Sequence, residues 1–314
     1  MIGKLPQPPS GKTGWPWTEE AIPLSPLMPN GKHWPKISIV TPSYNQGQFL
    51  EETIRAVLLQ NYHNLEYIIM DGGSTDNSIE IIKKYEPWLT YWVSEKDNGQ
   101  SDAIYRGFEL STGEIIAYIN SDDFYLPQAF QFVSKHFVKN SAADFLIGSC
   151  YHINSAGEVI RKYYGFRQNV ESMLSLGMQY SQPACFWLRN AFFSVNGFDR
   201  AMRFCFDADL FLKLTSKKKP SYTLRTLAVF RRHSLSKSST IAEIANAEGL
   251  LLGEKYGFHK LAPNTRISMK KKFYFKLLLM RALGIAYDLF FDTKWFLKSL
   301  RPNVLLSRII FYKK

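Results

Sequence analysis

The sequence predicts an α/β protein with a mostly parallel central sheet flanked by helices. Between residues 37 and 149, short apolar segments typical of strands alternate with amphipathic segments of helical period. Two of the expected strands, residues 65–70 and 115–119, run directly into acidic turns. Because ligands of open α/β sheets bind beyond the carboxyl ends of the strands, these turns also mark the expected site.

Each element follows from a local pattern. The β-branched run 37–41 predicts the first strand, and the apolar stripe within 48–61 predicts the helix after it. Strand 65–70 precedes a helix that Ser74 or Thr75 is expected to cap and that ends near Tyr85. The remaining expected elements are a strand over 91–94, a helix over 101–110, a strand over 115–119, a helix over 127–138, a strand over 143–149, a hairpin over 151–164, a helix over 207–216 and helices beyond residue 241.

The N-terminal region differs from this regular core. Residues 1–35 hold eight of the fifteen prolines, which excludes a regular helix or a central strand. The region is either a flexible leader or an extended arm. Its three tryptophans, at positions 15, 17 and 34, favour an arm that docks on the main domain, because exposed tryptophan serves no purpose in a linker.

The net charge of +12 is confined to the C-terminal region. Residues 255–314 hold 14 Lys or Arg against two Asp, which accounts for the whole excess. A nucleic-acid enzyme usually carries basic charge around its site, so nucleic acid is not an expected partner and an anionic membrane surface is. The apolar segment 273–296 with its interspersed charges is typical of a helix in the membrane interface. The alternative is a helix packed on the domain with a solvated basic face.

Cysteine use and the N-terminus indicate the compartment. Three widely spaced cysteines without a C-x-x-C pair argue against a disulfide framework or a zinc site and fit a reducing cytoplasm. Lys4 is followed by prolines rather than an apolar run, so no signal peptide is expected. No apolar run is long enough for a spanning helix. The expected location is the cytoplasm, with peripheral attachment to the inner face of the cell membrane.

Candidate ligand-binding residues follow the first two expected strands. Tyr44 offers an aromatic face at the end of the first strand, suited to stacking on a nucleobase; an ordinary βα turn is the alternative. Asp71 ends the second strand, and the two glycines after it permit a close backbone approach. Its carboxylate can accept hydrogen bonds from a base N–H or a ribose hydroxyl. Asp76 is expected to support the next helix N-terminus instead.

The strongest single signal is the acidic turn after the fourth strand, Asn120-Ser121-Asp122-Asp123. Mg²⁺ and Mn²⁺ favour oxygen ligands, and a nucleotide diphosphate supplies further oxygens. Of two adjacent carboxylates, one can hold metal while the other holds ribose or orients its neighbour. Two like charges this close are costly unless a cation offsets them. The alternative is an Asp-rich surface turn.

In this order and spacing, these motifs resemble the family 2 glycosyltransferases of GT-A fold, over roughly residues 35–233. The resemblance also rests on Asp97-Asn98-Gly99-Gln100-Ser101-Asp102-Ala103. Enzymes of this family move a sugar from a nucleotide diphosphate to an acceptor, usually with inversion and a divalent metal. The expected organisation is an arm over 1–35, a GT-A domain over 36–240 with a nucleotide-binding half to residue 150 and an acceptor half from 151, and a basic helical extension over 241–314.

The resemblance also assigns roles on the donor side. The residues implied to hold the nucleoside are Thr41, Pro42, Tyr44 and Asp71. Asp122 is implied to bind Mn²⁺ or Mg²⁺, with Asp123 beside it. Asn120 departs from the first Asp of the D-x-D element, which weakens the expected metal site or makes it depend on the diphosphate. Many relatives carry Arg-Asn where this chain has Ile104-Tyr105, and Arg106, one position further on, is the candidate to replace that positive charge near phosphate.

The acceptor half is implied to supply the base. An inverting transfer needs a carboxylate that takes the acceptor proton as the hydroxyl attacks the anomeric carbon, while the metal steadies the departing diphosphate. Asp207 matches the Asp of the family's Glu-Asp element, although Phe206 replaces the Glu. Asp209 is its rival on the acceptor side, with helix N-terminal charge as the alternative reading.

Three further residues resemble family positions. Gln182 and Trp187 resemble an acceptor-side loop, where Trp187 either stacks on a sugar or packs in the core. His233 resembles a histidine that occurs late in the sequences of the family and lies near metal or diphosphate. The alternative for His233 is a structural role. Arg231 or Arg232 could also reach phosphate.

The sequence therefore predicts an inverting, metal-dependent glycosyltransferase of cell-surface polysaccharide or glycolipid synthesis, with a UDP- or dTDP-sugar as donor and a saccharide or lipid-linked acceptor. One alternative is a sugar nucleotidyltransferase, which usually has a Gly-rich basic loop near the N-terminus that this chain lacks. The other is a non-catalytic binding protein of the same fold, which Asn120 and Phe206 keep open.

Overall fold

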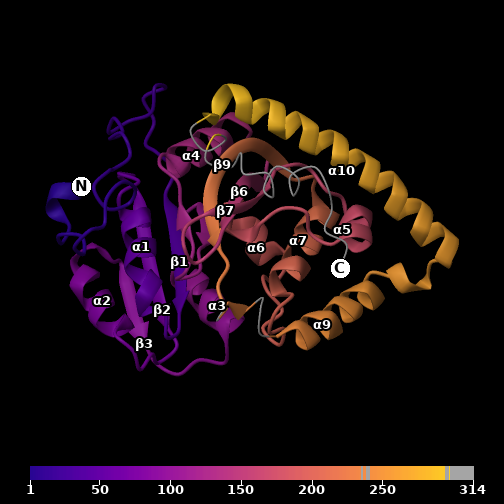
Figure 1. The fold of residues 1–314 in the computed structure, drawn as a ribbon, viewed down its shortest axis with the longest axis horizontal. Coiled ribbons are helices and arrows are strands. Elements are labelled where there is room, and N and C mark those ends of the chain that lie inside the picture. The colour runs from indigo at the N-terminus through magenta and orange to yellow at the C-terminus, as the bar shows by residue number, and fades with distance from the viewer. Residues whose placement is uncertain (235, 238–240, 294–296, 298–314) are drawn as a thin grey trace. The chain divides into compact units, whose positions relative to one another are not determined.

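The structure is a computed structural model that describes residues 1–234, 236–237, 241–293 and 297 (Figure 1). Contacts divide the chain into two compact units. Unit 1 comprises residues 1–145 and 185–201, and unit 2 comprises residues 146–184 and 202–314. The parts of the expected C-terminal extension at 294–296 and 298–314 lie outside the described residues.

Unit 1 is built on parallel strands, as predicted. β1 pairs in parallel with both β2 and β4, β2 pairs in parallel with β3, and β8 joins the far side of β4 antiparallel. The first two strands are buried along almost their whole length, as expected for a sheet covered on both faces. The strands of the unit are β1 (Ile37–Ser43), β2 (Leu65–Asp71), β3 (Tyr91–Ser94), β4 (Ile115–Tyr118), the two-residue β5 (Phe124–Tyr125) and β8 (Cys185–Leu188).

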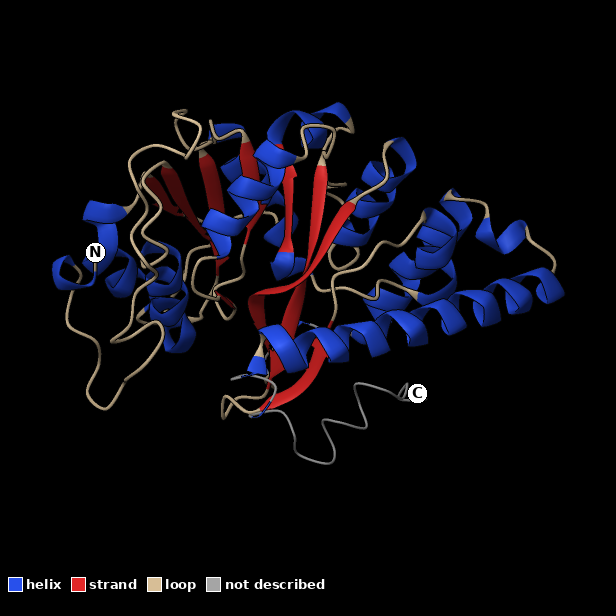
Figure 2. Cartoon of the chain, turned by 90° about the horizontal axis from the view of Figure 1, so that it is seen from above, coloured by secondary structure: helices blue, strands red, loops and turns tan. Residues whose placement is uncertain are grey.

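The helices of unit 1 lie between these strands in the chain, and Figure 2 shows blue helices beside the red strands. α1 buries Leu50, Ile54 and Val57, which belong to the predicted apolar stripe. α2 begins at Ser78, so the expected cap at Ser74 or Thr75 is wrong; both residues bond to neighbouring loops instead. The helices are α1 (Gly47–Leu58), α2 (Ser78–Tyr85), α3 (Gln100–Leu110), α4 (Ala129–Lys139) and α6 (Arg189–Ser194), with 3-10 turns at Ile2–Lys4 and Glu86–Trp88.

The proline-rich N-terminal region is docked on unit 1. Trp17 and Trp34 are buried. Arg55 of α1 is fully buried, and its guanidinium donates hydrogen bonds to the backbone carbonyls of Pro6 (2.8 Å), Pro16 (3.0 Å) and Trp17 (2.8 Å). A buried guanidinium needs hydrogen-bond acceptors, and the backbone carbonyls of the arm supply them to Arg55. Of the two expectations for this region, the docked arm is the one that the structure bears out.

Unit 2 combines a strand hairpin with helices. β6 and β7 form the predicted antiparallel hairpin, and β9 pairs in parallel with β6. α5 is capped by Asn169, whose side chain accepts the Ser172 N–H at 3.0 Å. The elements are β6 (Phe145–Ile153), β7 (Val159–Tyr163), β9 (Ser221–Arg231), α5 (Val170–Leu176), α7 (Phe206–Lys217), α9 (Ala242–Lys255), α10 (Pro263–Phe291), and 3-10 turns at Gln182–Ala184 and Phe258–Lys260.

Within unit 2, the long helix α10 is fastened to the strand hairpin by a buried charge cluster. The Lys162 ammonium of β7 is fully buried and bonded to Asp288 and, at 3.2 Å, to Asp292. It also lies over the rings of Tyr151 and Tyr164, with centroids at 4.5 and 5.2 Å. Burial lowers the pKa of Lys162, and the two carboxylates oppose that shift. Among the described residues, no helix is both long and apolar enough to pass through a bilayer.

Candidate nucleotide-sugar site

Several of the predicted donor-side residues gather at one edge of the unit 1 sheet. Ser43 is paired with Asp71, and Asp71 with Ser94 of β3. Val40 is paired with Tyr118, so the turn that follows β4 leaves the sheet on the same side. Because these strands are parallel, their carboxyl ends lie together, as expected for a ligand crevice in an α/β sheet.

Asp71 is held by its own loop. The side chain is only 2% exposed. One carboxylate oxygen accepts hydrogen bonds from the Ser74 N–H (2.8 Å), the Gly73 N–H (3.2 Å) and the Ser94 hydroxyl (2.7 Å). The other oxygen accepts the Ser74 hydroxyl at 2.6 Å. In this structure, Asp71 therefore shapes the loop that follows β2.

The loops after β1 and β2 are locked to each other. Asn45, in the left-handed conformation at φ 51°, accepts the Thr75 N–H at 2.8 Å, and its own N–H bonds the Ser74 hydroxyl at 2.8 Å. Asp76 accepts the N–H groups of Gly47 and Ser78, both at 2.9 Å, and thereby supports the starts of α1 and α2. Burial raises the pKa of Asp76, but these hydrogen bonds outweigh it and leave the pKa lowered.

Gly72 lets a third loop approach this edge. A Cβ at position 72 would lie 2.8 Å from a carboxylate oxygen of Asp97. The other Asp97 oxygen accepts the Gly99 N–H at 2.8 Å just before α3 begins. A side chain at position 72 would displace the Asp97 carboxylate, so the first of the two glycines after Asp71 has a steric reason.

The turn after β4 is also pre-organised. The Thr53 hydroxyl of α1 bonds the carbonyls of Ser121 (3.0 Å) and Asp123 (2.7 Å). Asn120 accepts the Gln100 amide at 2.6 Å and donates to the buried Asp123 carboxylate at 3.3 Å. Asp122 is the partly exposed carboxylate of this turn.

These residues fit a cation that is shared with a ligand. The described residues contain no cluster of three or more acidic, His or Cys side chains that could hold a metal unaided. Asp122 supplies one accessible carboxylate, and Asp123 is turned toward Asn120. Such a donor set suits a divalent ion that completes its oxygen shell with diphosphate.

The nucleoside-side residues have different exposures. Tyr44 is 62% exposed directly after β1, where its ring is available for stacking. Thr41 and Pro42 are buried within β1, and the Thr41 hydroxyl lies 3.1 Å from the Tyr67 hydroxyl. Arg106 on α3 forms an ion pair with Glu95, so its charge is already paired.

Trp187 lies in the core of unit 1. Its ring has no exposed surface and contacts Phe108, Tyr118 and Phe145 edge to face. This is the core-packing alternative that the sequence left open. A fully buried ring has no free face for stacking on a sugar in this structure. Gln182 of unit 2 is 7% exposed within its 3-10 turn.

Asp207 and Asp209 both lie in the first turn of α7 in unit 2, but they differ in burial and in charge partners. Asp207 is partly buried, and burial raises its pKa to about 6, although a 2.7 Å hydrogen bond from the Ala208 N–H opposes the shift. Asp209 is fully buried and paired with Lys213 (2.7 Å) and Lys255 (2.6 Å). A carboxylate with a pKa near neutrality is suited to accept and release a proton.

Sequence analysis missed Glu248 of α9, which positions the start of α7. Its carboxylate accepts three consecutive backbone N–H groups, of Arg203 (2.6 Å), Phe204 (2.9 Å) and Cys205 (2.7 Å). Its charge also contributes to the raised pKa of Asp207. A single Glu within a helix of mixed composition gives no sequence signal for such a contact.

Arg200 was missed as well. Its guanidinium pairs with the buried carboxylate of Asp102 at the start of α3 and lies 5.1 Å from the Tyr105 ring centroid. His233, a predicted ligand, follows β9 in unit 2, and its backbone N–H bonds the Ser236 hydroxyl at 2.9 Å. Arg231 beside it is buried, and Arg232 is exposed.

Comparison with known proteins gives the same family. The sequence pattern described as "Glycosyl transferase family 2" matches residues 38–200, which is more than half of the chain. A chondroitin synthase of Pasteurella multocida is 27% identical over 188 residues, 59% of this chain and 19% of that protein. The glycosyltransferase GlyG of Streptococcus pneumoniae is 32% identical over 123 residues, 38% of this chain and 40% of that protein.

The chain matches only part of its curated relatives. An uncharacterized glycosyltransferase of Nostoc is covered over 37% of its length and one of Mycoplasma pneumoniae over 54%. Among solved structures, S. aureus TarS in complex with UDP-GlcNAc superposes with a TM-score of 0.57 at 14% identity, over 85% of this chain and 76% of that one.

A mannosyltransferase of Pyrobaculum calidifontis in complex with GDP-Man and Mn²⁺ superposes with a TM-score of 0.53 at 17% identity, over 88% of this chain and 84% of that one. At such identities these likenesses establish the fold, which is of the GT-A type. The fold, the strand-end motifs and the match over residues 38–200 agree, and the chain belongs to glycosyltransferase family 2.

Proposed function

We propose that this protein transfers a sugar from a nucleotide diphosphate to an acceptor hydroxyl with inversion, in the synthesis of a cell-surface polysaccharide or glycolipid. The observation that carries the proposal is the shared edge of β1, β2 and β4, where an exposed aromatic ring, a rigid glycine loop and an acidic turn lie together. The similarity to a chondroitin synthase and a hyaluronan synthase of Pasteurella multocida, and to solved structures bound to UDP-GlcNAc or GDP-Man, supports the reaction class.

On the donor side, Tyr44 stacks on the base and the loop held by Asp71 receives the nucleoside. Asp122 is the proposed ligand for Mn²⁺ or Mg²⁺, Asp123 orients Asn120 beside it, and His233 is a further proposed ligand. When bound, the cation neutralises charge on the departing diphosphate. Asp122 and the preformed turn hold the diphosphate end of the donor in place.

On the acceptor side, Asp207 is the proposed base. Inversion needs a single displacement: the acceptor oxygen bonds to the anomeric carbon as the bond to the diphosphate breaks, and the acceptor proton passes to a carboxylate. Asp207 suits this role because its raised pKa makes it a stronger base than an ordinary carboxylate. Asp209, neutralised by two lysines, is less suited to accept a proton.

A donor screen tests the proposal. The full chain is incubated with UDP-, dTDP- and GDP-sugars in Mn²⁺ or Mg²⁺, with saccharide and lipid-linked acceptors, and release of the nucleoside diphosphate is measured. We expect one nucleotide class to react and the reaction to stop with EDTA. Release of pyrophosphate from a sugar phosphate and a nucleoside triphosphate would indicate a nucleotidyltransferase instead.

Calorimetry separates an enzyme from a binding protein. We expect UDP or another nucleoside diphosphate to bind more tightly with Mn²⁺ than without it. Metal-dependent binding of both donor and product without turnover of any donor would favour a non-catalytic protein. Asn120 and Phe206 are the two departures from the family pattern that make this control necessary.

A further inference from the structure

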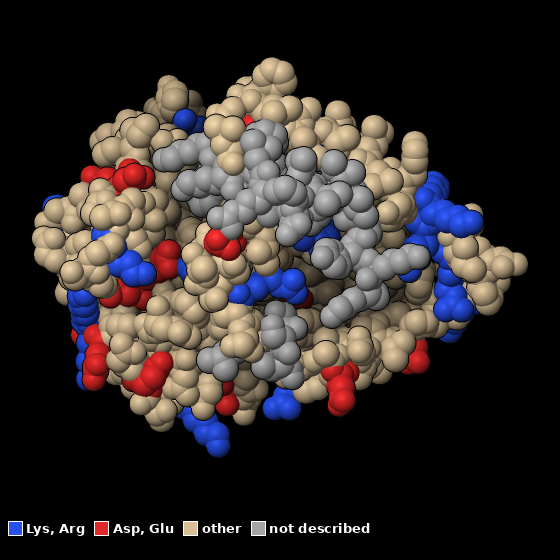
Figure 3. All heavy atoms as spheres, in the orientation of Figure 1, with Lys and Arg blue, Asp and Glu red and all other residues tan. Residues whose placement is uncertain are grey.

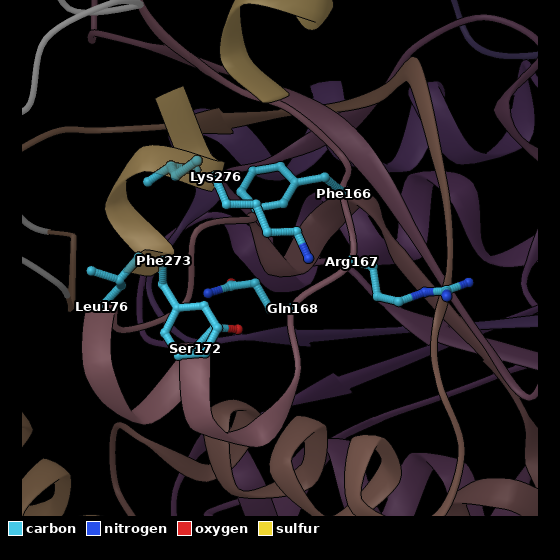
Figure 4. Close-up of a pocket in the computed structure, with 8 residues that line it drawn as sticks. Phe166, Arg167, Gln168, Ser172, Leu176, Phe273 and Lys276 are labelled. Atoms are coloured by element: carbon cyan, nitrogen blue, oxygen red, sulfur yellow. The ribbon is translucent and has the colours of Figure 1, made fainter. Parts of the chain in front are cut away.

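Helix α10 turns one narrow face toward the other elements of unit 2. Leu277 is buried against Tyr164 and Phe166, Phe273 is buried as well, and a Cβ at position 284 would lie 2.4 Å from the Tyr164 ring. Figure 4 shows Phe273 of α10 opposite Ser172 and Leu176 of α5, beside a small hollow that Phe166 and Lys276 also line. The helix is thus anchored along one side.

The charges in the second half of α10 lie on this same anchored side. Arg281 and Asp288 are both buried, and Asp288 bonds Lys162 and the Tyr164 hydroxyl. The sequence showed these charges as interruptions of an apolar segment. In the structure they do not interrupt the outer face, because they point inward.

The outer face of α10 is consequently a continuous apolar stripe. Between positions 277 and 291 of this fully described helix, no charged side chain lies on the exposed side. Phe275 is 73% exposed and Phe290 is 78% exposed. At 1.5 Å per residue the stripe is about 24 Å long. It consists of Phe275, Leu279, Ala282, Leu283, Ala286 and Phe290.

A cluster of exposed lysines lies at the N-terminal end of the stripe. It consists of Lys270, Lys271, Lys272 and Lys276, all exposed. Figure 3 shows the blue side chains gathered over this part of α10, while the rest of its visible outer edge is tan. The surface of α10 therefore combines positive charge and apolar area in one helix.

We propose that the outer face of α10 binds the surface of an anionic lipid bilayer, with the apolar stripe in the acyl–headgroup boundary and the lysine cluster on the headgroups. Helices that lie in an interface have this separation of an apolar face from basic residues. Anionic lipid attracts each lysine near the surface. This inference is independent of the proposed reaction.

Charge favours lipid over a second copy of this chain as the occupant. The one acidic residue of α10 is Asp288, and it is buried. A second α10 packed on the stripe would therefore offer the lysine cluster no opposite charge. A bilayer that contains acidic lipid supplies both the apolar layer and the anions.

Vesicle sedimentation of the full chain tests this proposal. We expect binding to vesicles of phosphatidylcholine with one third phosphatidylglycerol, weak binding to phosphatidylcholine, and loss of binding at high salt. The triple change Lys270→Glu, Lys271→Glu and Lys272→Glu should weaken binding on the order of 100-fold, at about fivefold per lysine.

Lys217, Lys218 and Lys219 provide a matched control, since they are three consecutive exposed lysines at the end of α7. Their conversion to Glu changes the net charge equally, and we expect binding to fall by less than about threefold. An equal loss in both triple variants would mean that net charge, not α10, drives binding, and would overturn the proposal.

The apolar stripe has its own matched pair. Leu279→Ser with Leu283→Ser should weaken vesicle binding about tenfold. Leu250→Ser with Leu251→Ser, on similarly exposed leucines of α9, should leave binding unchanged. Circular dichroism verifies that each variant is folded. If the Leu279 and Leu283 changes instead convert a dimer to a monomer without lipid, the stripe is a contact between copies and the proposal fails.

A fluorescent label gives a readout that does not depend on lysine variants. Phe290→Cys, carrying a polarity-sensitive dye, should shift to the blue with anionic vesicles, whereas Leu251→Cys should not. An unshifted spectrum at position 290 while the protein sediments with vesicles would place the contact elsewhere.

Discussion

The loop after β2 and the turn after β4 are both acidic and leave the same sheet edge, yet their carboxylates are used differently. Asp71 is buried and accepts hydrogen bonds from Gly73, Ser74 and Ser94. Asp122 is partly exposed in a turn that Thr53 and Gln100 hold from outside. A strand-end carboxylate can thus be buried in the hydrogen bonds of its own loop or stay partly exposed at the sheet edge.

The start of α7 repeats this contrast. Asp209 is neutralised by two lysines, and Asp207 is left with a raised pKa. Spacing in the sequence cannot separate the two, because both occupy the first turn of one helix. Whether a carboxylate serves mainly stability or mainly the proposed reaction can be tested by replacing these residues one at a time.

The largest effect is expected for Asp207→Asn. Loss of the proposed base should lower kcat by about 10²–10⁴-fold while donor binding is retained. The comparison variant Asp209→Asn leaves two lysines without their buried partner, so it should lower the free energy of unfolding by about 1–3 kcal/mol. Steady-state kinetics and thermal unfolding measure the two. Unchanged kcat in Asp207→Asn would remove the base assignment.

The same residue predicts a pH dependence. Because Asp207 accepts a proton only when ionised, kcat/KM should fall about tenfold per pH unit below about 6. Its folded pKa lies above the ordinary value, so ionisation costs stability as pH rises from about 4 through 6. Asp207→Asn should therefore be more stable than the wild type at pH 7 by up to about 3 kcal/mol, and no more stable below pH 4. A wild-type acid limb near pH 4 would contradict this.

The next effect concerns Asp122. Asp122→Asn should reduce kcat/KM on the order of 10²-fold and abolish the gain in nucleotide affinity that Mn²⁺ provides, because a neutral amide is a poorer metal ligand. Unfolding temperature should hardly change, since the side chain is partly exposed. Metal titrations of product binding give the measurement. Undiminished Mn²⁺ dependence would exclude Asp122 as the ligand.

Asp71→Ala should act mainly through stability. The change leaves the Ser74 and Gly73 N–H groups without their buried acceptor, and the free energy of unfolding should fall by about 2–4 kcal/mol. Asp76→Asn, at a more exposed loop position, should cost about 1 kcal/mol. Denaturant unfolding compares them. A fully stable Asp71→Ala protein would show that the loop does not depend on this carboxylate.

The smallest effect is expected at Tyr44. Tyr44→Ala should raise the Kd for the nucleoside diphosphate about tenfold through lost stacking, and Tyr44→Phe should leave it unchanged. Neither should alter unfolding, because the ring is 62% exposed. Equal losses in both variants would indicate that the hydroxyl, not the ring face, makes the contact.

Much of unit 1 could be predicted because its signals are local. β3 was predicted with its observed bounds, and β1, β2 and β4 within two residues. The start of α2 was wrong because Ser74 bonds Asp71 and Asn45, partners outside the helix. The acidic turns were found because they follow strands directly in the chain.

The features that the sequence did not predict depend on contacts between distant positions of the chain. Glu248 supports the start of α7 from a helix more than forty residues away, and a single acidic residue carries no mark of that role. The amphipathic character of α10 was visible, but the inward direction of Arg281 and Asp288 was not, because it depends on Lys162 and Tyr164.

The buried ammonium of Lys162 has a practical consequence for shortening this protein. Its two carboxylate partners, Asp288 and Asp292, are near the C-terminal end of α10. A version cut before residue 288 would strand a positive charge among the rings of Tyr151 and Tyr164, at a cost of several kcal/mol. Removal of the basic tail to improve solubility should therefore begin after Asp292, so that both carboxylate partners of Lys162 are kept.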